Sequence, residues 1–423
     1  MKKILILVSL ILGLNSFSFT QTINGRFTSA LYTFERFDTL NNSATYARTF
    51  QLLYLTFGNK NVALKTYMNL ENDISEKLTY DPRFRMYNFY LDVKNLFELV
   101  YFKLGRQPLY NTLGGGVFDG MTLGINYKGF DLNGYYGGNV PAYQKVDFTD
   151  NLENNYVGGA NLTVYAISNT RIALRYVNKA FENIAYTTAR LDPDYNTISY
   201  YIDNSSQQFR YVMAEVSYSQ PKNFRVDTRY QYELNYATTS RFEISGRYDQ
   251  IEDLGLTAYY NYRKPLVRYN SIFSVFDFKN TQEIEIGADY LIDKKYKLIG
   301  KFGNVSYEDE SSQRISLGLS SRWGTISGRK TFGYAGELDA ISFYTAQTIL
   351  DGLLTPNFSF GYTRYKLSTD AATNEMITVL LGCNYRPIRT LSFDLQGQYL
   401  NNKIYNNDFR LLVKLNFWFN HNF

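Results

Sequence analysis

Histidine and cysteine are almost missing from this sequence of 423 residues, which holds one of each, His421 and Cys383. A serine nucleophile with a histidine base would have to recruit a side chain next to the C-terminus. Metal sites built from histidine and cysteine need several such ligands, and a lone cysteine forms no internal disulfide. These absences indicate that the chain is not an enzyme, and they predict neither a metal site nor a cofactor.

Long apolar runs are also missing. After residue 20 no run approaches the roughly 18 apolar residues of a membrane-spanning helix, and the mean hydropathy is −0.32. The first residues, MKKILILVSLILGLNSFSFT, place Lys2 and Lys3 before an apolar run from Ile4 to Leu14. Because this order is that of a secretory signal peptide, we predict a signal peptide over residues 1–20 and an exported chain over 21–423.

Neither sign of charge dominates. The net charge is +5, and 20% of the residues are charged. This balance is too even to indicate nucleic acid as a partner. Tryptophan (2) and proline (8) are scarce, whereas tyrosine (40) and phenylalanine (31) are abundant. Such aromatic residues favour β-strands, and in membrane barrels they gather in belts at the two interfaces.

The C-terminal stretch, DFRLLVKLNFWFNHNF over 408–423, alternates between apolar and mostly polar positions. Side chains alternate between the two faces of a strand, so this pattern predicts a strand with one apolar and one polar face. It runs for about ten residues with aromatics crowded near its end, which is typical of a tilted strand that crosses a bilayer.

Similar segments recur along the whole chain. We predict strands at 23–37, 46–58, 61–71, 83–94, 96–107, 120–127, 130–137, 156–166, 170–179, 209–219, 223–233, 240–248, 254–263, 282–291, 295–304, 312–323, 325–332, 338–348, 357–366, 376–385, 390–400 and 408–419. The fold class is all-β, a transmembrane antiparallel up-and-down β-barrel. Its best strand count is about 22, and merging weak neighbours such as 325–332 and 338–348 lowers the count to about 18 or 20.

The connections alternate between short and long. Short ones such as Lys128-Gly129 and Asp293-Lys294 are typical of turns, and longer ones lie between them, the longest at 180–208. In an up-and-down barrel the tight turns are periplasmic and the long loops external. We therefore expect both termini on the periplasmic side.

Along the predicted strands that alternate cleanly, the charged residues occupy every second position and therefore share one face. A charge on the lipid face costs about 2–4 kcal/mol near the bilayer midplane, so this face is expected to point to the inside of the barrel. The predicted pore-lining residues are Arg225, Asp227, Arg229, Arg241, Glu243, Arg247, Glu285, Asp289, Arg314, Asp394, Arg410 and Lys414. Because arginine and carboxylate occur together, these side chains could equally serve to pair with one another across strands.

The alternating C-terminal stretch, which ends on Phe423, resembles the closing strand of Gram-negative outer-membrane β-barrels. The resemblance implies that the chain lies in outer-membrane lipid. It also implies that the barrel-insertion machinery recognises the strand that ends at Phe423.

The segment LGRQPLYNTLGGGVFDG, residues 104–120, resembles the GRQ-then-Gly-Asp-Gly passage of Gram-negative porins and alginate-export-type barrels. In porins the third external loop folds inward, so the resemblance implies a pore constriction at Arg106, Gln107 and Asp119, with Arg106 and Asp119 opposite each other. The alternative is a glycine-rich turn after an end-of-strand arginine at the membrane interface. The 180–208 loop is the rival candidate for a lid or a receptor surface.

The predicted function is a porin that gives passive diffusion of small polar solutes or ions through a hydrated barrel, since barrels of this size enclose an aqueous channel. The alternative is a closed or partner-filled barrel that acts as a structural, adhesive or receptor protein or as a polymer-export conduit. A transporter with an N-terminal plug is disfavoured, because the first strand begins almost at the expected cleavage site.

Overall fold

The computed structural model describes most of the chain beyond residue 20. The described residues are 21–37, 42–75, 81–110, 115–140, 146–149, 151–182, 186–191, 193–202, 208–269, 273, 276, 278–333, 336–366, 368, 370–404 and 407–423. The predicted signal peptide, residues 1–20, lies outside these ranges.

The structure is a closed antiparallel barrel of 22 strands. Its strands are β1 (Thr22–Phe37), β2 (Ser43–Gly58), β3 (Val62–Asp73), β4 (Arg83–Leu96), β5 (Val100–Pro108), β6 (Val117–Tyr127), β7 (Phe130–Asn139), β8 (Tyr156–Val164), β9 (Thr170–Ala180), β12 (Phe209–Gln220), β13 (Phe224–Glu233), β14 (Thr238–Ile251), β15 (Leu254–Arg263), β16 (Thr281–Ile292), β17 (Tyr296–Tyr307), β18 (Glu310–Ser321), β19 (Gly324–Gly333), β20 (Gly336–Ala346), β21 (Leu354–Lys366), β22 (Asn374–Ile388), β23 (Leu391–Asn401) and β24 (Asp408–Asn422).

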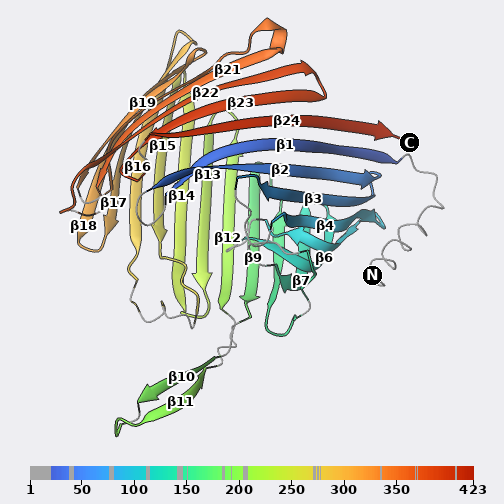
Figure 1. Ribbon diagram of the computed structural model, residues 1–423. Helices are drawn as coiled ribbons and strands as arrows, with labels where there is room; N and C mark the ends of the chain where they lie inside the picture. Colours follow the sequence, from blue (N-terminus) through green and yellow to red (C-terminus); the bar gives the residue numbers. More distant parts are fainter. Residues whose placement is uncertain are drawn as a thin grey trace.

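Each strand pairs with its neighbours along the chain, and β1 pairs with β24 to close the barrel (Figure 1). Thr28 Oγ1 donates a hydrogen bond of 2.9 Å to Asn416 Oδ1 across this seam. The predicted fold class and the best count of 22 are confirmed. β19 and β20 are separate strands, so the merged count is wrong.

The two rims of the barrel differ. Short connections lie at the rim where β1 begins and β24 ends, which we call the turn rim; Gly58 pairs there with Thr22. The opposite rim, the loop rim, carries the connections after β3, β5, β7, β9 and β15. A single turn of 3₁₀-helix, η3 (Leu350–Gly352), lies in the turn-rim connection between β20 and β21. Among the described residues no helix is long and apolar enough to cross a membrane.

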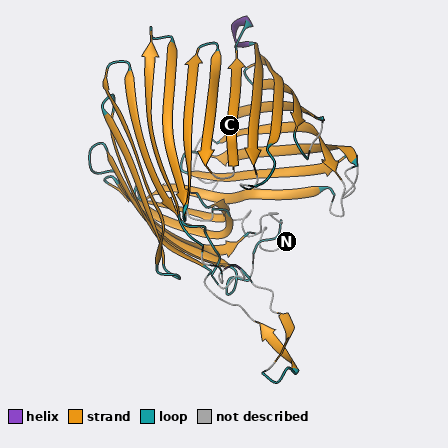
Figure 2. Ribbon diagram, turned by 90° about the vertical axis from the view of Figure 1, so that its left-hand side faces the viewer, coloured by secondary structure: helices purple, strands orange, loops and turns teal. Residues whose placement is uncertain are grey.

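Two predicted boundaries need correction. The strand expected at 96–107 begins only at Val100, because Asn95, Phe97 and Glu98 have positive φ values of 54°, 53° and 65° and turn the chain between β4 and β5. The connection expected to be a loop over 180–208 contains a hairpin of its own, β10 (Tyr186–Leu191) and β11 (Thr197–Ile202), apart from the barrel sheet (Figures 1 and 2).

The outer surface of the barrel is apolar. On β16, Ile284, Ile286 and Tyr290 are 54%, 57% and 49% exposed, and they alternate with Glu283, Glu285 and Asp289. Because successive side chains of a strand point to opposite faces, the charged residues lie on the inner face. The same alternation recurs on other strands, such as β13 and β24, and there it separates an apolar exterior from a charged interior.

Candidate functional site: the charged inner face

All the predicted pore-lining residues lie on the inner face, opposite the exposed apolar side chains of their strands. On β13 the exposed residues are Phe224 and Tyr230, which alternate with Arg225, Asp227 and Arg229. On β24 the exposed residues are Phe409, Leu411 and Val413, which alternate with Arg410 and Lys414. That these residues line an open pore remains a prediction.

Ion pairs connect the inner face from β9 to β14. Glu215 on β12 receives three arginines: Arg175 at 2.8 Å, Arg171 at 3.2 Å and Arg229 at 3.0 Å. Arg229 also lies 3.9 Å from Glu243 on β14. Glu215 is not among the predicted pore-lining residues, although it lies at an alternating position of β12 as they do on their strands.

Two further ion pairs reach across an intervening strand. Arg247 on β14 contacts both carboxylate oxygens of Asp289 on β16, at 2.7 and 3.1 Å, and between them on β15 lies Gly255. A side chain at this position would collide with the Arg247 guanidinium. Arg314 on β18 likewise lies 2.8 Å from Glu285 on β16. Glycine therefore leaves room for a bidentate pair between strands that are not neighbours.

A recess of about 580 Å³ opens into this part of the wall. Its lining includes Arg225, Asp227, Arg247, Glu285, Lys301 and Arg314. Side-chain exposures of 64% for Arg225 and 43% for Lys301 show that the cations on this face are not packed in a dry core. A solute against the wall meets both signs of charge within a few ångströms.

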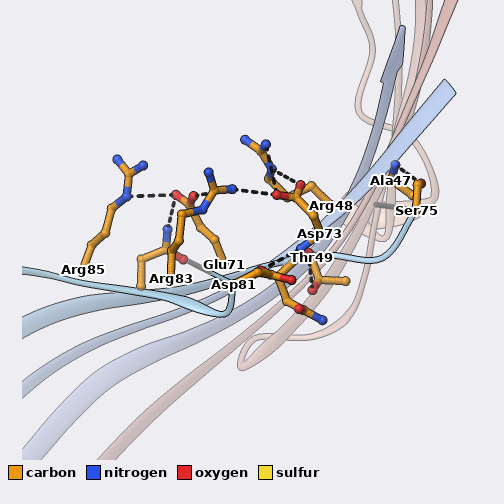
Figure 3. A network of polar contacts seen from close by, with 11 residues as sticks. Ala47, Arg48, Thr49, Glu71, Asp73, Ser75, Asp81, Arg83 and Arg85 are labelled. Carbon is orange, nitrogen blue, oxygen red and sulfur yellow. Dashed lines mark hydrogen bonds and ion pairs between the residues drawn. The ribbon is translucent and has the colours of Figure 1, made fainter. Parts of the chain in front are cut away.

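A second network covers the inner face of β2–β4 (Figure 3). Asp73 binds Arg48 at 2.6 Å and Arg83 at 3.0 Å, and Glu71 binds Arg83 at 3.4 Å and Arg85 at 3.5 Å. None of these residues is among the predicted pore-lining residues, because polar residues on both faces of β3 interrupt its alternation.

Near the seam, Asp394 on β23 contacts two residues of β24. Lys414 Nζ lies 3.1 Å from Asp394 Oδ2, and Asn416 Nδ2 donates to the same oxygen at 3.0 Å. Arg410 pairs instead with the fully buried Asp408, at 2.6 Å. The inner-face charges at the seam are thus paired in the same manner as those of β12–β18.

The structure does not place Arg106 and Asp119 opposite each other at a constriction. They are direct cross-strand neighbours on β5 and β6, joined by two hydrogen bonds of 2.7 and 2.9 Å. Each lies two residues from an exposed outer-face side chain, Leu104 and Met121. The pair therefore belongs to the outer face near the loop rim, where the alternative of an end-of-strand arginine puts it.

Residues 147–149 cover this pair. Arg106, which is fully buried, donates a hydrogen bond of 2.8 Å to the Asp147 carbonyl and lies 5.5 Å from the centre of the Phe148 ring. The Thr149 amide donates to Asp119 at 2.8 Å. The salt bridge thus fastens the β7–β8 connection to the wall. It exposes no arginine charge to a passing solute.

Gln107 lies on the inner face, next to Arg106 in the chain. Its Oε1 accepts a hydrogen bond of 2.8 Å from Thr122 Oγ1, and its Nε2 donates to the Gly120 carbonyl at 3.0 Å. The side chain is 2% exposed. Gln107 therefore packs against the wall, and a role for it at a constriction stays a prediction.

The two described ends of the β5–β6 connection, Leu109–Tyr110 and Gly115–Gly116, lie at the loop rim. Leu109 packs into an apolar cluster with Phe118, Tyr135, Val157, Val177 and Tyr211, all at inner-face positions of β6–β9 and β12. At the other end of the connection, the Gly115 carbonyl accepts a hydrogen bond of 3.2 Å from Lys179 on β9. Both described ends of this loop thus lie inside the wall; residues 111–114 are outside the described ranges.

In the described part of the chain no group of three or more histidine, cysteine, aspartate or glutamate residues could hold a metal ion. Cys383 is a free thiol at an outer-face position of β22. The single histidine, His421, stacks edge-on against Phe423 at 4.6 Å.

Comparison with known proteins gives a likeness of fold. No protein-family model matches the chain, and no curated protein matches it. Among solved structures, OccAB1 of Acinetobacter baumannii has a TM-score of 0.44 at 8% identity, covering 94% of this chain and 96% of that one. OpdK of Pseudomonas aeruginosa, solved with vanillate, has a TM-score of 0.45 at 8% identity, covering 95% and 99%.

OccK2 (OpdF) of P. aeruginosa, solved in complex with glucuronate, has a TM-score of 0.42 at 10% identity, covering 94% of this chain and 98% of that one. At identities and TM-scores this low, the likeness decides nothing about the solute or the mechanism of this chain.

Proposed function

We propose that the chain is a passive pore in the outer membrane of a Gram-negative bacterium, and that small polar solutes or ions cross through its interior. One observation carries the proposal: a closed barrel of 22 strands has an apolar exterior and partly exposed, mixed charges on its interior. Removing a charge from water is costly, and a buried charge is tolerated only when an opposite charge pairs with it. Charges as exposed as those of Arg225 and Lys301 therefore require water beside them.

The pairing of the inner charges determines the selectivity. The carboxylates Glu215, Asp289 and Glu285 each have more than one cationic partner. In turn, Arg229, Arg247 and Arg314 each contact two carboxylates, so the two signs of charge alternate along the wall and neither forms a separate patch there. We therefore propose a weak ion preference and discrimination chiefly by size. In this proposal the turn rim and both termini face the periplasm, and the loop rim faces the outside.

Liposome swelling tests the passive pathway. Liposomes that contain the refolded protein are diluted into isotonic solutions of uncharged sugars of increasing size, and swelling is followed by light scattering. We expect swelling rates that fall steadily with sugar size and do not saturate with concentration. The matched control is protein-free liposomes. Impermeability to the smallest sugar would overturn the proposal in favour of a closed or filled barrel.

Two partners also remain proposals: outer-membrane lipid around the apolar exterior, and the barrel-insertion machinery at the strand ending in Phe423. The Phe423 amide donates a hydrogen bond of 2.8 Å to the Gln21 carbonyl, so the last residue joins the closed seam. Deletion of Phe423 should slow insertion in cells while refolding into pure lipid vesicles stays unchanged; equal rates in cells would remove this partner.

A further inference from the structure

A small pocket at the loop rim differs from the rest of the interior. It encloses about 250 Å³ and is lined by Lys179, Phe181, Phe209 and Arg268. These residues come from the end of β9, the start of β12 and the connection after β15. The elements that bring them together are therefore distant in sequence, and the pocket exists only in the folded barrel.

The two cations of the pocket have no carboxylate partner among the described residues. Lys179 is 7% exposed and donates only to the Gly115 carbonyl, at 3.2 Å. Arg268 donates to Gln208 Oε1 at 2.8 Å; burial lowers the pKa of its guanidinium. Elsewhere on the inner face the cations we described pair with aspartate or glutamate. Two partly desolvated cations that line one pocket are costly unless an anion binds there.

Both cations of the pocket lie near one aromatic ring, that of Phe181. Lys179 Nζ lies 4.8 Å and Arg268 Cζ 5.0 Å from the centre of the Phe181 ring. The Phe209 ring stands edge-on to Phe181 at 6.1 Å, and Phe209 packs against the apolar cluster that contains Leu109. The pocket thus offers positive charge on one side and an apolar, aromatic surface on the other.

Gln208 holds this arrangement in place. Its side chain is 1% exposed. It accepts hydrogen bonds from the Phe181 amide and from Arg268, and it donates to the Phe181 carbonyl at 3.0 Å. One buried amide therefore fixes the ring and the guanidinium relative to each other, so little ordering remains to be done when a ligand enters.

We propose that this pocket binds a small organic acid, in which one carboxylate is attached to an aromatic or cyclic apolar body. The carboxylate lies between Lys179 and Arg268, and the apolar body contacts Phe181 and Phe209. An inorganic anion would leave the aromatic surface unused, and the small volume excludes a polymer. The inference rests on the proposed function in one respect: the site meets an external solute only if the loop rim faces outward.

Calorimetric titration of the folded protein in detergent micelles tests the site without requiring a conducting pore. Benzoate is the probe, with acetate, inorganic phosphate and benzylammonium as comparisons. We expect saturable binding of benzoate, at least tenfold weaker binding of acetate and phosphate, and none of benzylammonium. Lys179→Met and Arg268→Gln should each weaken benzoate binding at least tenfold. The matched control, Lys94→Met, removes a cation of β4 that lies 3.7 Å from Asp92 and should leave binding unchanged.

Folding of each variant is checked by its migration on gels before and after boiling. Arg268 lies in a connection and not in a strand, so Arg268→Gln remains informative even if Lys179→Met misfolds. Absent benzoate binding, equal binding by the variants, or equal binding of phosphate would overturn the proposal. Benzoate binding without sugar permeation would refute the pore but support the binding site. Sugar permeation without benzoate binding would support the pore but refute the binding site.

Discussion

At the scale of single residues, the surroundings of an ion pair decide what the pair does. The Arg106–Asp119 pair is almost entirely buried, with side-chain exposures of 0% and 4%, whereas Arg225–Asp227 has exposures of 64% and 34%. Removing one partner of a buried pair leaves an unpaired charge in a dry site. A solvated pair contributes little. The two pairs therefore have different roles: the first secures a connection and the second lines the interior.

Arg106→Ala should lower the free energy of unfolding by about 3–5 kcal/mol, because Asp119 remains buried without its partner. The matched variant Arg225→Ala should change it by less than about 1 kcal/mol. Urea titration of the protein in lipid vesicles, followed by the fluorescence of Trp323 and Trp418, measures both. Similar losses of unfolding free energy in the two variants would contradict the assignment of Arg106 to a buried, stabilising ion pair.

Gly255→Ala should fail to stabilise the barrel, because the new methyl group displaces the Arg247 guanidinium from Asp289. The control is Gly361→Ala, where a Cβ meets nothing within 4 Å; it should raise stability by about 0.5–1 kcal/mol, the usual difference between glycine and alanine in a strand. We expect the free energy of unfolding of Gly255→Ala to be lower than that of the wild type by up to about 1 kcal/mol. An equal gain in both variants would show that the strand-skipping pair contributes nothing.

At the scale of elements, alternation predicted the barrel strands, because one face must meet lipid and the other water. The same alternation also indicated the correct face for Arg106, because Arg106 lies two residues from Leu104 and therefore points to the same, outer face. The resemblance to porin loops instead favoured a position for Arg106 inside the barrel. The β10–β11 hairpin was missed because it lies apart from the barrel sheet and shows no apolar face of the required length. The strand-skipping pairs depend on strand register, which alternation alone does not determine.

Leu109, at the described start of the β5–β6 connection, packs against the inner wall. Leu109→Asp should release this connection from the apolar cluster on the inner wall, because a carboxylate cannot be buried among Phe118, Tyr135 and Val177 without a partner. Single-channel recordings should then show a larger or noisier open-state current than the wild type. The control Leu266→Asp changes a residue that is already 49% exposed in the connection after β15. Identical currents in all three proteins would mean that this connection does not narrow the path.

At the scale of the whole molecule, the number of strands and the distribution of charge act together. A barrel of this size encloses more space than its side chains fill, and the inner-face cations retain substantial exposure. Composition and alternation were sufficient to predict both features. The pocket formed by Lys179 and Arg268 could not be predicted, because it requires residues from β9, β12 and the connection after β15 to meet at one rim.

The conductance of single molecules in a planar lipid bilayer tests the central claim, that the interior is a continuous aqueous path. We predict steady ohmic openings with a small reversal potential under a salt gradient, because the charges of the inner face are largely paired. A silent bilayer, recorded with protein whose folding and insertion are verified by its migration on gels before and after boiling, would contradict the pore and leave a closed or filled barrel.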